Sequence, residues 1–397
     1  MRNPERIDRI RNALRESQWD LIVCALPINV LLLSGYWPVV GTGLAIASAE
    51  GRITLLVPED EEDLAKRGWA DEIRTFKPSS LDEIVTTAEA IRAPFRGLVK
   101  SFSAKPARVG LETHETSEPA SYAAMHLYGG MMRQLCEDAF NLAALSSVDA
   151  VLADLRGHKT EFEIGRIRTA CQIAERAFQN GLEQIKAGTT ELEAAFRKPL
   201  STSLANFAEL GRADGFAWCM SGANSALASG AYARSRAKQI ESCDLVMVHC
   251  NSYLDGYWTD ITRTYSLVKK GERRESMHDA VFAAREAALA AIRPGAKAAG
   301  VDKAARDVLR ARGLGPQFKH STGHGVGFSA IIALARPCLH PKSEDTLEVG
   351  MVFNVEPAVY VNGYGGARHC DMVAVTEAGV ELLTPFQCRA DELTIDG

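Results

Sequence analysis

The first part of the chain changes from helical to strand-like spacing of its apolar residues. Apolar positions near the N-terminus recur at helical intervals, and three short apolar runs then follow at 21–26, 44–48 and 53–57. Such runs, rich in β-branched residues and bounded by turn residues, predict buried strands. The stretch 21–49 carries no charge and is long enough to span a bilayer, but prolines and glycines interrupt it, so we interpret it as strand, turn and strand. With helical stretches such as 122–135, these strands predict an α/β domain.

A second pattern begins at Glu161. Residues 161–185 are amphipathic throughout and predict a long helix. The segment TTELEAAF at 189–196 predicts the start of another helix, because a threonine cap precedes a glutamate in the first turn. Residues 277–292 and 301–312 predict two further helices, each followed by glycine or proline. The middle of the second half is therefore expected to be helical.

Strand-like segments flank these helices. Residues 244–254 and 258–268 are joined through an Asp-Gly turn dipeptide, which predicts an antiparallel hairpin. The tail returns to strands at 351–361 and 369–376. Helices in the middle and strands at both ends predict an α+β domain whose antiparallel sheet is completed by its last segment.

Length and charge limit the domain number and the class of partner. A chain of 397 residues exceeds what one hydrophobic core usually organises, so we expect an N-terminal α/β domain at 1–157 and a second domain at 158–397. Its 45 basic and 50 acidic residues include one run of five acidic residues at 59–63 but no run of basic residues longer than two. The sequence therefore predicts no nucleic-acid partner and no membrane partner, and a small molecule or short peptide is the expected substrate.

The cysteines and the N-terminus indicate a compartment. Nine cysteines are spread along the chain without a CxxC pair, which is typical of reduced thiols rather than of a disulfide framework. The first twenty residues carry charges throughout and contain no apolar block of the kind found in secretory signals. The sequence therefore predicts a cytoplasmic protein.

Residues that could carry chemistry are concentrated in four segments. They are His249 and Asp260 on the predicted hairpin, His324 in a glycine-rich run, Glu356 before a proline, and Cys370 on the last strand. These residue types are the usual ligands of divalent transition metals, and five of them from one sheet could meet in a single site. Each one alone also has an ordinary structural explanation, since strand histidines are commonly hydrogen-bonded and strand cysteines are commonly core residues.

The order and the amino-acid sequences of these segments resemble those of the superfamily of methionine aminopeptidase, aminopeptidase P, prolidase and creatinase. The segments that carry the resemblance are LVMVHCNSYLDGYWTDITRTY, STGHGVGF, LEVGMVFNVEPAVY and GGARHCDMVAVTEAG, and in the N-terminal half WDLIVCALPI followed by NVLLLSGYW. The resemblance implies an N-terminal domain of the creatinase/prolidase type and a C-terminal pita-bread domain with a curved antiparallel sheet. It also implies a site within that sheet and a homodimer.

Compared position by position, this sequence differs from the active peptidases of the superfamily at some of the metal-ligand positions. Their hairpin supplies two metal-binding aspartates eleven residues apart, and here these positions hold His249 and Asp260. The family's ligand histidine matches His324 and its first ligand glutamate matches Glu356, whereas its bridging glutamate falls on Cys370. Two carboxylates are therefore replaced.

Further positions concern proton transfer and substrate binding. The family's two auxiliary histidines fall on Ser229 and near Ile331, so neither is present. We expect Arg368 to hold a substrate carboxylate in a bidentate fork, and Ser229 and Tyr257 to border the substrate.

These exchanges argue against an ordinary two-metal site, because bridging two cations about 3.5–4 Å apart requires carboxylates. The remaining set suits a single zinc, iron or manganese ion. The alternative is a metal-free, creatinase-like route, in which Glu356 or Asp260 activates water and His324 or His249 carries the proton. The sequence thus predicts a hydrolase of an amide, lactam or amidine-type C–N bond. Two alternative hypotheses remain: the protein is a non-catalytic binding protein for a peptide or small ligand, or it is a genuine Xaa-Pro dipeptidase or aminopeptidase.

Overall fold

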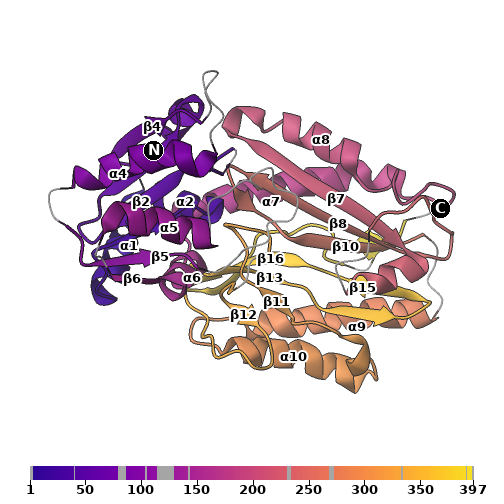
Figure 1. Ribbon diagram of the computed structural model, residues 1–397. Helices are drawn as coiled ribbons and strands as arrows, with labels where there is room; N and C mark the ends of the chain where they lie inside the picture. The colour runs from indigo at the N-terminus through magenta and orange to yellow at the C-terminus, as the bar shows by residue number, and fades with distance from the viewer. Residues whose placement is uncertain are drawn as a thin grey trace. The chain divides into compact units, whose positions relative to one another are not determined.

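The computed structural model describes residues 3–39, 41–78, 86–102, 105–113, 129–141, 144–229, 234–267, 272–331, 334–389 and 391–395. The chain divides into two compact units, Met1–Arg156 with Ile331–Leu334 and Gly157–Ala330 with Ala335–Gly397. Figure 1 colours the chain from indigo at the N-terminus to yellow at the C-terminus. Within the described ranges, no helix is long and apolar enough to cross a membrane.

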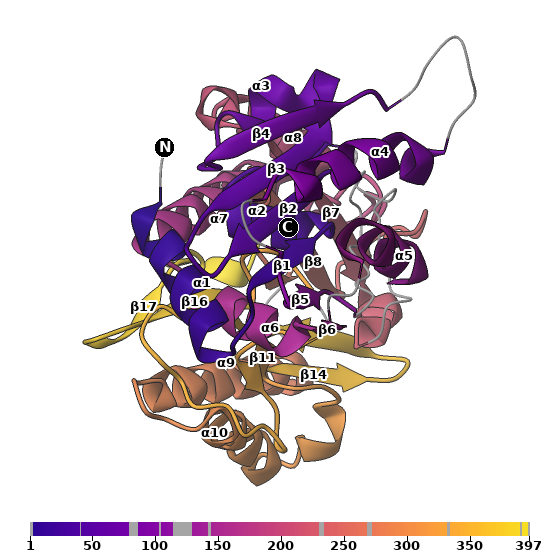
Figure 2. The same ribbon diagram turned by 60° about the vertical axis from the view of Figure 1, so that its left-hand side comes forward.

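The first unit is built on a six-stranded sheet. Its three central strands pair antiparallel with one another, and the strands outside them pair parallel with their neighbours. Across the sheet its strands are β4 (Glu72–Phe76), β3 (Ile53–Pro58), β2 (Leu44–Ser48), β1 (Leu21–Cys24), β5 (Arg108–Leu111) and β6 (Ala144–Ser147). Its helices include α1 (Pro4–Glu16), α2 (Pro27–Ser34), α3 (Glu62–Ala65), α4 (Thr87–Lys100), α5 (Gly129–Phe140) and α6 (Asp149–Gly157). Helices α4 and α5 lie side by side and bury Phe95, Leu98 and Leu135 against this sheet (Figure 2). This is the predicted α/β domain.

One prediction in this unit is wrong. The stretch 21–49 was expected to fold as strand, turn and strand, but the helix α2 lies between β1 and β2. Pro27 occupies its first turn, and Gly35 ends it with a left-handed backbone, φ 71°. Every residue of α2 is buried, so its sequence shows no amphipathic period from which a helix could be recognised. Of the expected helix 122–135, the part before residue 129 lies outside the described residues.

A buried carboxyl group in this unit makes its stability depend on pH. Glu112 is 3% exposed and accepts hydrogen bonds from the backbone nitrogens of Ala25 and Leu26 and from Asn29. Burial nevertheless raises the pKa of Glu112 to about 7. Since the folded chain keeps this proton where the unfolded chain loses it, the free energy of unfolding should fall by about 3 kcal/mol between pH 4.5 and 7. In the Glu112→Gln variant, the free energy of opening measured by hydrogen exchange of the α2 amides should no longer fall between pH 4.5 and 7. A fall as large as in the unsubstituted protein would contradict the raised pKa of Glu112.

The second unit begins with the predicted long helix, α7 (Glu161–Gly181), and Thr160 and Glu163 form a capping box at its start. The helix expected at 189–196 is absent, and α8 begins only at Arg197 (Arg197–Ala205). Tertiary contacts explain the difference, because the buried carboxylate of Glu191 accepts hydrogen bonds from Ser221, Asn224 and the Arg236 backbone. Only an isolated turn forms there: Thr190 and Glu193 make the capping hydrogen bonds, the Ala194 nitrogen donates to the Thr190 carbonyl, and Phe196 ends the turn with a φ of 56°.

The sheet of this unit places the predicted hairpin at its centre. Strands β8 (Leu245–Leu254) and β10 (Ile261–Ser266) pair antiparallel, with β7 (Ala213–Ser221) and the short β9 (Tyr257–Trp258) also on β8. Asp255 and Gly256 turn the chain with positive φ angles of 50° and 82°. The hairpin prediction is confirmed.

The remaining elements follow in the predicted order. They are α9 (Glu272–Ala291), α10 (Ala298–Ala311), β11 (Gly323–His324), β12 (Cys338–Leu339), β13 (Val352–Val355), β14 (Ala358–Val361), β15 (Gly365–Arg368), β16 (Asp371–Thr376) and β17 (Gly379–Leu382). All ladders among these strands are antiparallel. Helices α9 and α10 pack side by side against the C-terminal strands and form one core with them (Figure 1). An α+β second domain is thus observed.

Candidate functional site

Backbone pairing brings three of the predicted site residues together. His249 on β8 lies opposite Thr262 on β10, and Asp260 immediately precedes β10. A bridge between Thr262 and Cys370 then joins the hairpin to the segment between β15 and β16. Residues that are distant in the sequence therefore become neighbours because their strands pair.

His324 and Glu356 reach the same place from β11 and the end of β13. The Asn354 amide links His324 to Asp260, because its oxygen accepts from the backbone nitrogen of His324 at 2.6 Å and its nitrogen donates to Asp260 Oδ2 at 3.3 Å. His324 Nε2 lies 3.5 Å from Asp260 Oδ2 and 3.9 Å from Glu356 Oε1. One imidazole thus faces two carboxylates.

Arg368 occupies the other side of this group. Its Nε donates to Thr262 Oγ1 at 3.1 Å, and its Nη2 lies 3.4 Å from His249 Nδ1. Its Nη1 is 3.9 Å from Glu356 Oε2 and donates to the Ala228 carbonyl at 3.5 Å. The guanidinium charge is therefore shared among several long contacts rather than neutralised in one bidentate pair.

His249 is a neutral imidazole at physiological pH. It is buried, and its Nδ1 lies 3.0 Å from Thr262 Oγ1 and 3.8 Å from Asp260 Oδ1. Burial lowers the pKa of His249 to about 4, and the nearby Arg368 acts in the same direction, against the opposing charge of Asp260. The imidazole ring is stacked on Trp218, with centroids 5.5 Å apart.

Cys370 is a protonated thiol in this structure. It is fully buried, and its Sγ donates to the backbone carbonyl of Asp260 at 3.0 Å. Burial raises the pKa of the Cys370 thiol well above its ordinary value, and the charges of Asp260 and Glu356 add to this effect. A thiol held in this way is not pre-formed as a metal-binding thiolate.

The donor set fits one cation better than two. Donor atoms around a four-coordinate zinc ion lie about 3.3 Å apart, and the spacings of His324 Nε2 to Asp260 and Glu356 approach that value. The side that holds His249 and Cys370 fits a cation poorly, because Arg368 places its positive charge there and both donors are already hydrogen-bonded. The His324 side is therefore the better place for a single ion, although its three donor groups are more widely spaced than around a bound zinc ion.

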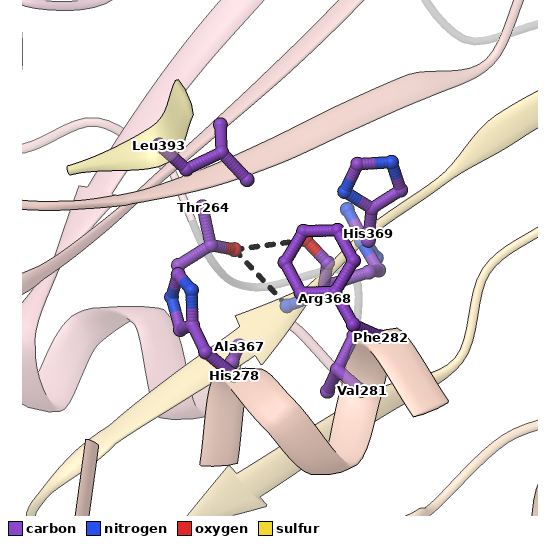
Figure 3. Close-up of a pocket in the computed structure, with 8 residues that line it drawn as sticks. All are labelled: Thr264, His278, Val281, Phe282, Ala367, Arg368, His369 and Leu393. Carbon is purple, nitrogen blue, oxygen red and sulfur yellow. Dashed lines mark hydrogen bonds between the residues drawn. The ribbon is translucent and has the colours of Figure 1, made fainter. Parts of the chain in front are cut away.

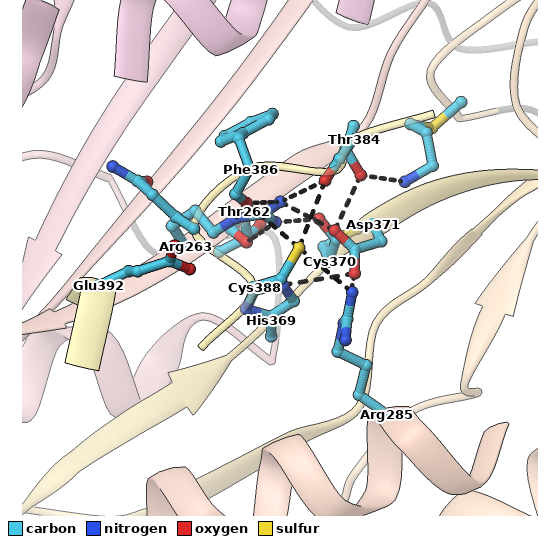
Figure 4. Close-up of polar contacts among 12 residues, drawn as sticks. Thr262, Arg263, Arg285, His369, Cys370, Asp371, Thr384, Phe386, Cys388 and Glu392 are labelled. Atoms are coloured by element: carbon cyan, nitrogen blue, oxygen red, sulfur yellow. Dashed lines mark hydrogen bonds and ion pairs between the residues drawn. The ribbon is translucent and has the colours of Figure 1, made fainter. Parts of the chain in front are cut away.

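Among the described residues, the groups of three donor atoms that all lie within 4.8 Å of one another are His369, Asp371 and Cys388, and Glu241, Cys243 and Asp244; Asp260, His324 and Glu356 do not meet this criterion. In the first group Asp371 already accepts from Arg263 and Arg285 at 2.8 and 2.5 Å, and Arg285 also contacts Cys388 Sγ (Figure 4). Two buried guanidinium groups leave no place for a cation there. The second group is largely exposed and contains an aspartate paired with Lys238.

The sequence analysis missed Asn354 and Tyr360. Asn354 and Thr262 organise the charged groups, and His320 Nε2 lies 3.0 Å from the hydroxyl of Tyr360. Burial raises the pKa of Tyr360 to about 12, and burial lowers the pKa of His320. Asn354 lies two residues before Glu356, so strand alternation alone could have placed both on one face.

Ser229 and Tyr257, the other two expected substrate-binding residues, do not contact the charged groups as Arg368 does in the described contacts. Ser229 is partly exposed and follows Ala228, whose carbonyl accepts from Arg368. Tyr257 is 2% exposed and packs against Phe328, with ring centroids 5.5 Å apart, which is a core position. Ile331, at the second auxiliary histidine position, is exposed.

Behind Arg368, a small cavity of about 10 Å³ lies between β15 and α9. Thr264, His278, Phe282 and His369 line it, and the Thr264 hydroxyl bonds both backbone groups of Arg368 (Figure 3). This volume has room for about one water molecule. The contact at Thr264 fixes the backbone from which the Arg368 side chain extends.

A two-domain chain with an imidazole facing two carboxylates on an antiparallel sheet defines a hydrolase of the pita-bread superfamily. The sequence pattern of metallopeptidase family M24 matches residues 165–377, and that of the creatinase/prolidase N-terminal domain matches residues 6–156. The chain belongs to metallopeptidase family M24, in the branch that carries this N-terminal domain. The predictions of fold, of superfamily and of a hydrolase are confirmed.

Relatives along the whole chain support this assignment. The Xaa-Pro dipeptidases of Pyrococcus furiosus and Pyrococcus horikoshii are each 30% identical over 380 residues, which cover 96% of this chain and 97% of theirs. The crystal structure of the prolidase from Pyrococcus horikoshii OT3 superposes with a TM-score of 0.76 at 28% identity, covering 97% of this chain and 99% of that chain. A prolidase from Pyrococcus furiosus gives a TM-score of 0.74 at 29% identity, over 95% and 99% of the two chains.

Proposed function

We propose that the protein hydrolyses an amide-type C–N bond in a small substrate or short peptide, with a single divalent ion held by Asp260, His324 and Glu356. The observation that carries this proposal is the imidazole of His324 between two carboxylates, opposite a guanidinium. Relatives named Xaa-Pro dipeptidases make short Xaa-Pro peptides the first substrates to test.

Charge supports one ion rather than two. Relative to the ligand set of the active peptidases, His249 and Cys370 replace two carboxylates by an imidazole and a thiol, which do not carry the negative charge of a carboxylate. Those exchanges remove two negative charges, which is the charge that one divalent cation balances. A second cation beside Arg368 would add repulsion in a buried site where electrostatic interactions are strong.

Other residues of the site have separate roles in the proposed hydrolysis: positioning, substrate binding and proton donation. A bound ion would supply Lewis acidity and a water molecule that ionises near neutral pH. Asn354 holds Asp260 and His324 in place by its two hydrogen bonds. Arg368 binds a carboxylate or carbonyl oxygen of the substrate, oriented by Thr262. Because Ser229 and Ile331 provide no imidazole, the hydroxyl of Tyr360, bonded to His320, is the group we assign to donate a proton to the leaving nitrogen.

Elemental analysis tests the site directly. We expect about one equivalent of zinc, iron or manganese per chain in the purified protein, and a large loss of metal in Glu356→Gln because a neutral amide replaces a ligand carboxylate. Turnover of Xaa-Pro dipeptides and small amides should be lost in the same variant. Two equivalents would favour an ordinary dinuclear peptidase, and none with retained turnover would favour the metal-free route.

Dimerisation stays a prediction. The superfamily resemblance, and the prevalence of two-fold symmetric homodimers among soluble oligomers, favour a dimer. Light scattering at micromolar concentration should therefore give a mass near twice that of one 43.1 kDa chain. A mass near one chain would refute the prediction.

A further inference from the structure

The first unit contains a cavity of about 720 Å³ on one face of its sheet. Ile46 on β2 lies opposite Thr54 on β3, which lies opposite Glu72 on β4, and directly paired residues point to the same face. Ser101 and Phe102, which directly follow α4, also line the cavity, whereas no described residue of α4 does. The face is therefore left open where the helix ends. Cavities of this size are typical of small-molecule sites.

A nearly buried hydroxyl faces this cavity. Thr54 is 3% exposed and lines the cavity, yet its hydroxyl has no hydrogen-bond partner among the described residues. Leu21 and Ile46, which line the cavity from β1 and β2, belong to the apolar core of this face. Thr54 thus occupies a position where an apolar residue is expected, and a polar group there is unfavourable unless something bonds it. This hydroxyl points to a ligand with a hydrogen-bonding atom.

Beside Thr54, two arginines share one carboxylate. Arg52 Nη2 donates to Glu72 Oε2 at 2.6 Å, and Arg74 Nε donates to Glu72 Oε1 at 2.7 Å. Arg74 Nη2 also donates to Ser101 Oγ at 3.0 Å. Two guanidinium groups with one carboxylate leave one positive charge in excess and further N–H groups for a ligand. The planar arrangement of these donors matches a carboxylate.

The other charged residues of the lining do not neutralise this excess. Asp20 precedes β1, two strands from β3, so it lies about 10 Å from the arginine end. Its carboxylate accepts from two backbone nitrogens at the start of β5. Glu50 and Lys105 are both exposed and opposite in charge. Among the described residues, Glu72 is the carboxylate that pairs with the two arginines.

We propose that this cavity binds a small organic carboxylate with an apolar body. Arg52 and Arg74 bind the carboxylate, and the Thr54 hydroxyl donates to it. The apolar body packs against Ile46 and Phe102. All the lining residues belong to the first unit, and none belongs to the candidate hydrolytic site. The proposal is therefore independent of the proposed function.

Calorimetry on the full-length protein with 4-phenylbutyrate tests the class of ligand. 4-Phenylbutan-1-ol has the same apolar body without the charge, so it should bind about tenfold more weakly. Acetate has the charge without the apolar body, and it should also bind at least about tenfold more weakly. Equal affinity for 4-phenylbutyrate and the alcohol, or no saturable binding of 4-phenylbutyrate, would overturn the proposal.

Substitutions test whether the ligand binds in this cavity. Arg74→Gln removes the charge and should weaken binding of 4-phenylbutyrate by about tenfold, with binding of the alcohol unchanged. Thr54→Val keeps the shape of the side chain but removes its hydroxyl, and should weaken 4-phenylbutyrate by about threefold to tenfold. Arg133→Gln is the control, because this arginine of α5 is half-exposed, pairs with Glu137 and lies outside the lining. It should leave the dissociation constant unchanged.

Arg368 is another arginine that attracts carboxylates, so Arg368→Gln separates the two sites. Binding that is weakened in Arg74→Gln and unchanged in Arg368→Gln supports the cavity. The reverse pattern, or no effect of either Arg74→Gln or Thr54→Val, overturns it. If circular dichroism shows that Arg74→Gln does not fold, Thr54→Val decides, since it changes no charge.

Discussion

Asp371→Asn is expected to lower the free energy of unfolding by about 3–5 kcal/mol, because it leaves the buried guanidinium of Arg263 without its counter-charge and leaves Arg285 with Glu286 alone. Arg263 is fully buried and Arg285 is 3% exposed, and both donate to the Asp371 carboxylate, which Thr384 also contacts (Figure 4). Burial alone would raise the pKa of Asp371, but Arg263 and the other cationic neighbours hold it well below its ordinary value. Urea unfolding followed by tryptophan fluorescence measures the change.

A matched exchange at the surface is the control for this variant. Asp391 also pairs with an arginine, Arg389, but both side chains are more than two-thirds exposed. Exposed ion pairs contribute little, so Asp391→Asn should leave the unfolding midpoint unchanged within error. Equal effects of the two substitutions would show that the buried cluster is not a stabilising charge network.

Restoring both carboxylates, in the double variant His249→Asp with Cys370→Glu, is expected to raise manganese or cobalt binding from about one to about two equivalents per chain. The two carboxylates would return the charge and the bridging geometry that a second cation needs. We do not expect full peptidase activity, because Ser229 and Ile331 still provide no imidazole for proton transfer. Elemental analysis after equilibration with each metal gives the stoichiometry.

The matched control replaces the same two residues by alanine. His249→Ala with Cys370→Ala removes the side chains without adding charge, so it should not gain a second ion. Cys370→Glu alone should change the metal content if position 370 adjoins the metal, and should mainly reduce stability if it is only a packing position. Unchanged metal content in the carboxylate double variant would refute the placement of both residues beside the ion.

Elements with a strong local signal could be predicted from the sequence. The hairpin that carries His249 and Asp260 follows from two apolar runs around an Asp-Gly turn, and α7 follows from the amphipathic period of its residues. Helix α2 could not be recognised, since every side chain in it is buried. The helix expected at 189–196 failed because the buried Glu191 bonds distant backbone and side-chain groups.

The candidate site, too, could be predicted only in part from the sequence. Its ligand-type residues could be identified by residue type and family resemblance, and the structure brings His249, Asp260, His324, Glu356 and Cys370 into one neighbourhood. What these residues bond to could not be read from the sequence. Asn354 becomes important only because β11 and β13 meet, and Cys370 is a hydrogen-bonded thiol only because its strand lies beside Asp260.

The bridge between Thr262 and Cys370 also determines when the site comes into being during folding. Cys370 and Asp260 are 110 residues apart in the sequence, and contacts of such long range form slowly because a long loop must close first. The hairpin can fold locally, but the site exists only after the strand that carries Arg368 has joined it. Any ligand of this site therefore binds, and stabilises, only chains that have completed the second unit. A nascent or truncated chain that ends before β15 would contain the hairpin without a working site.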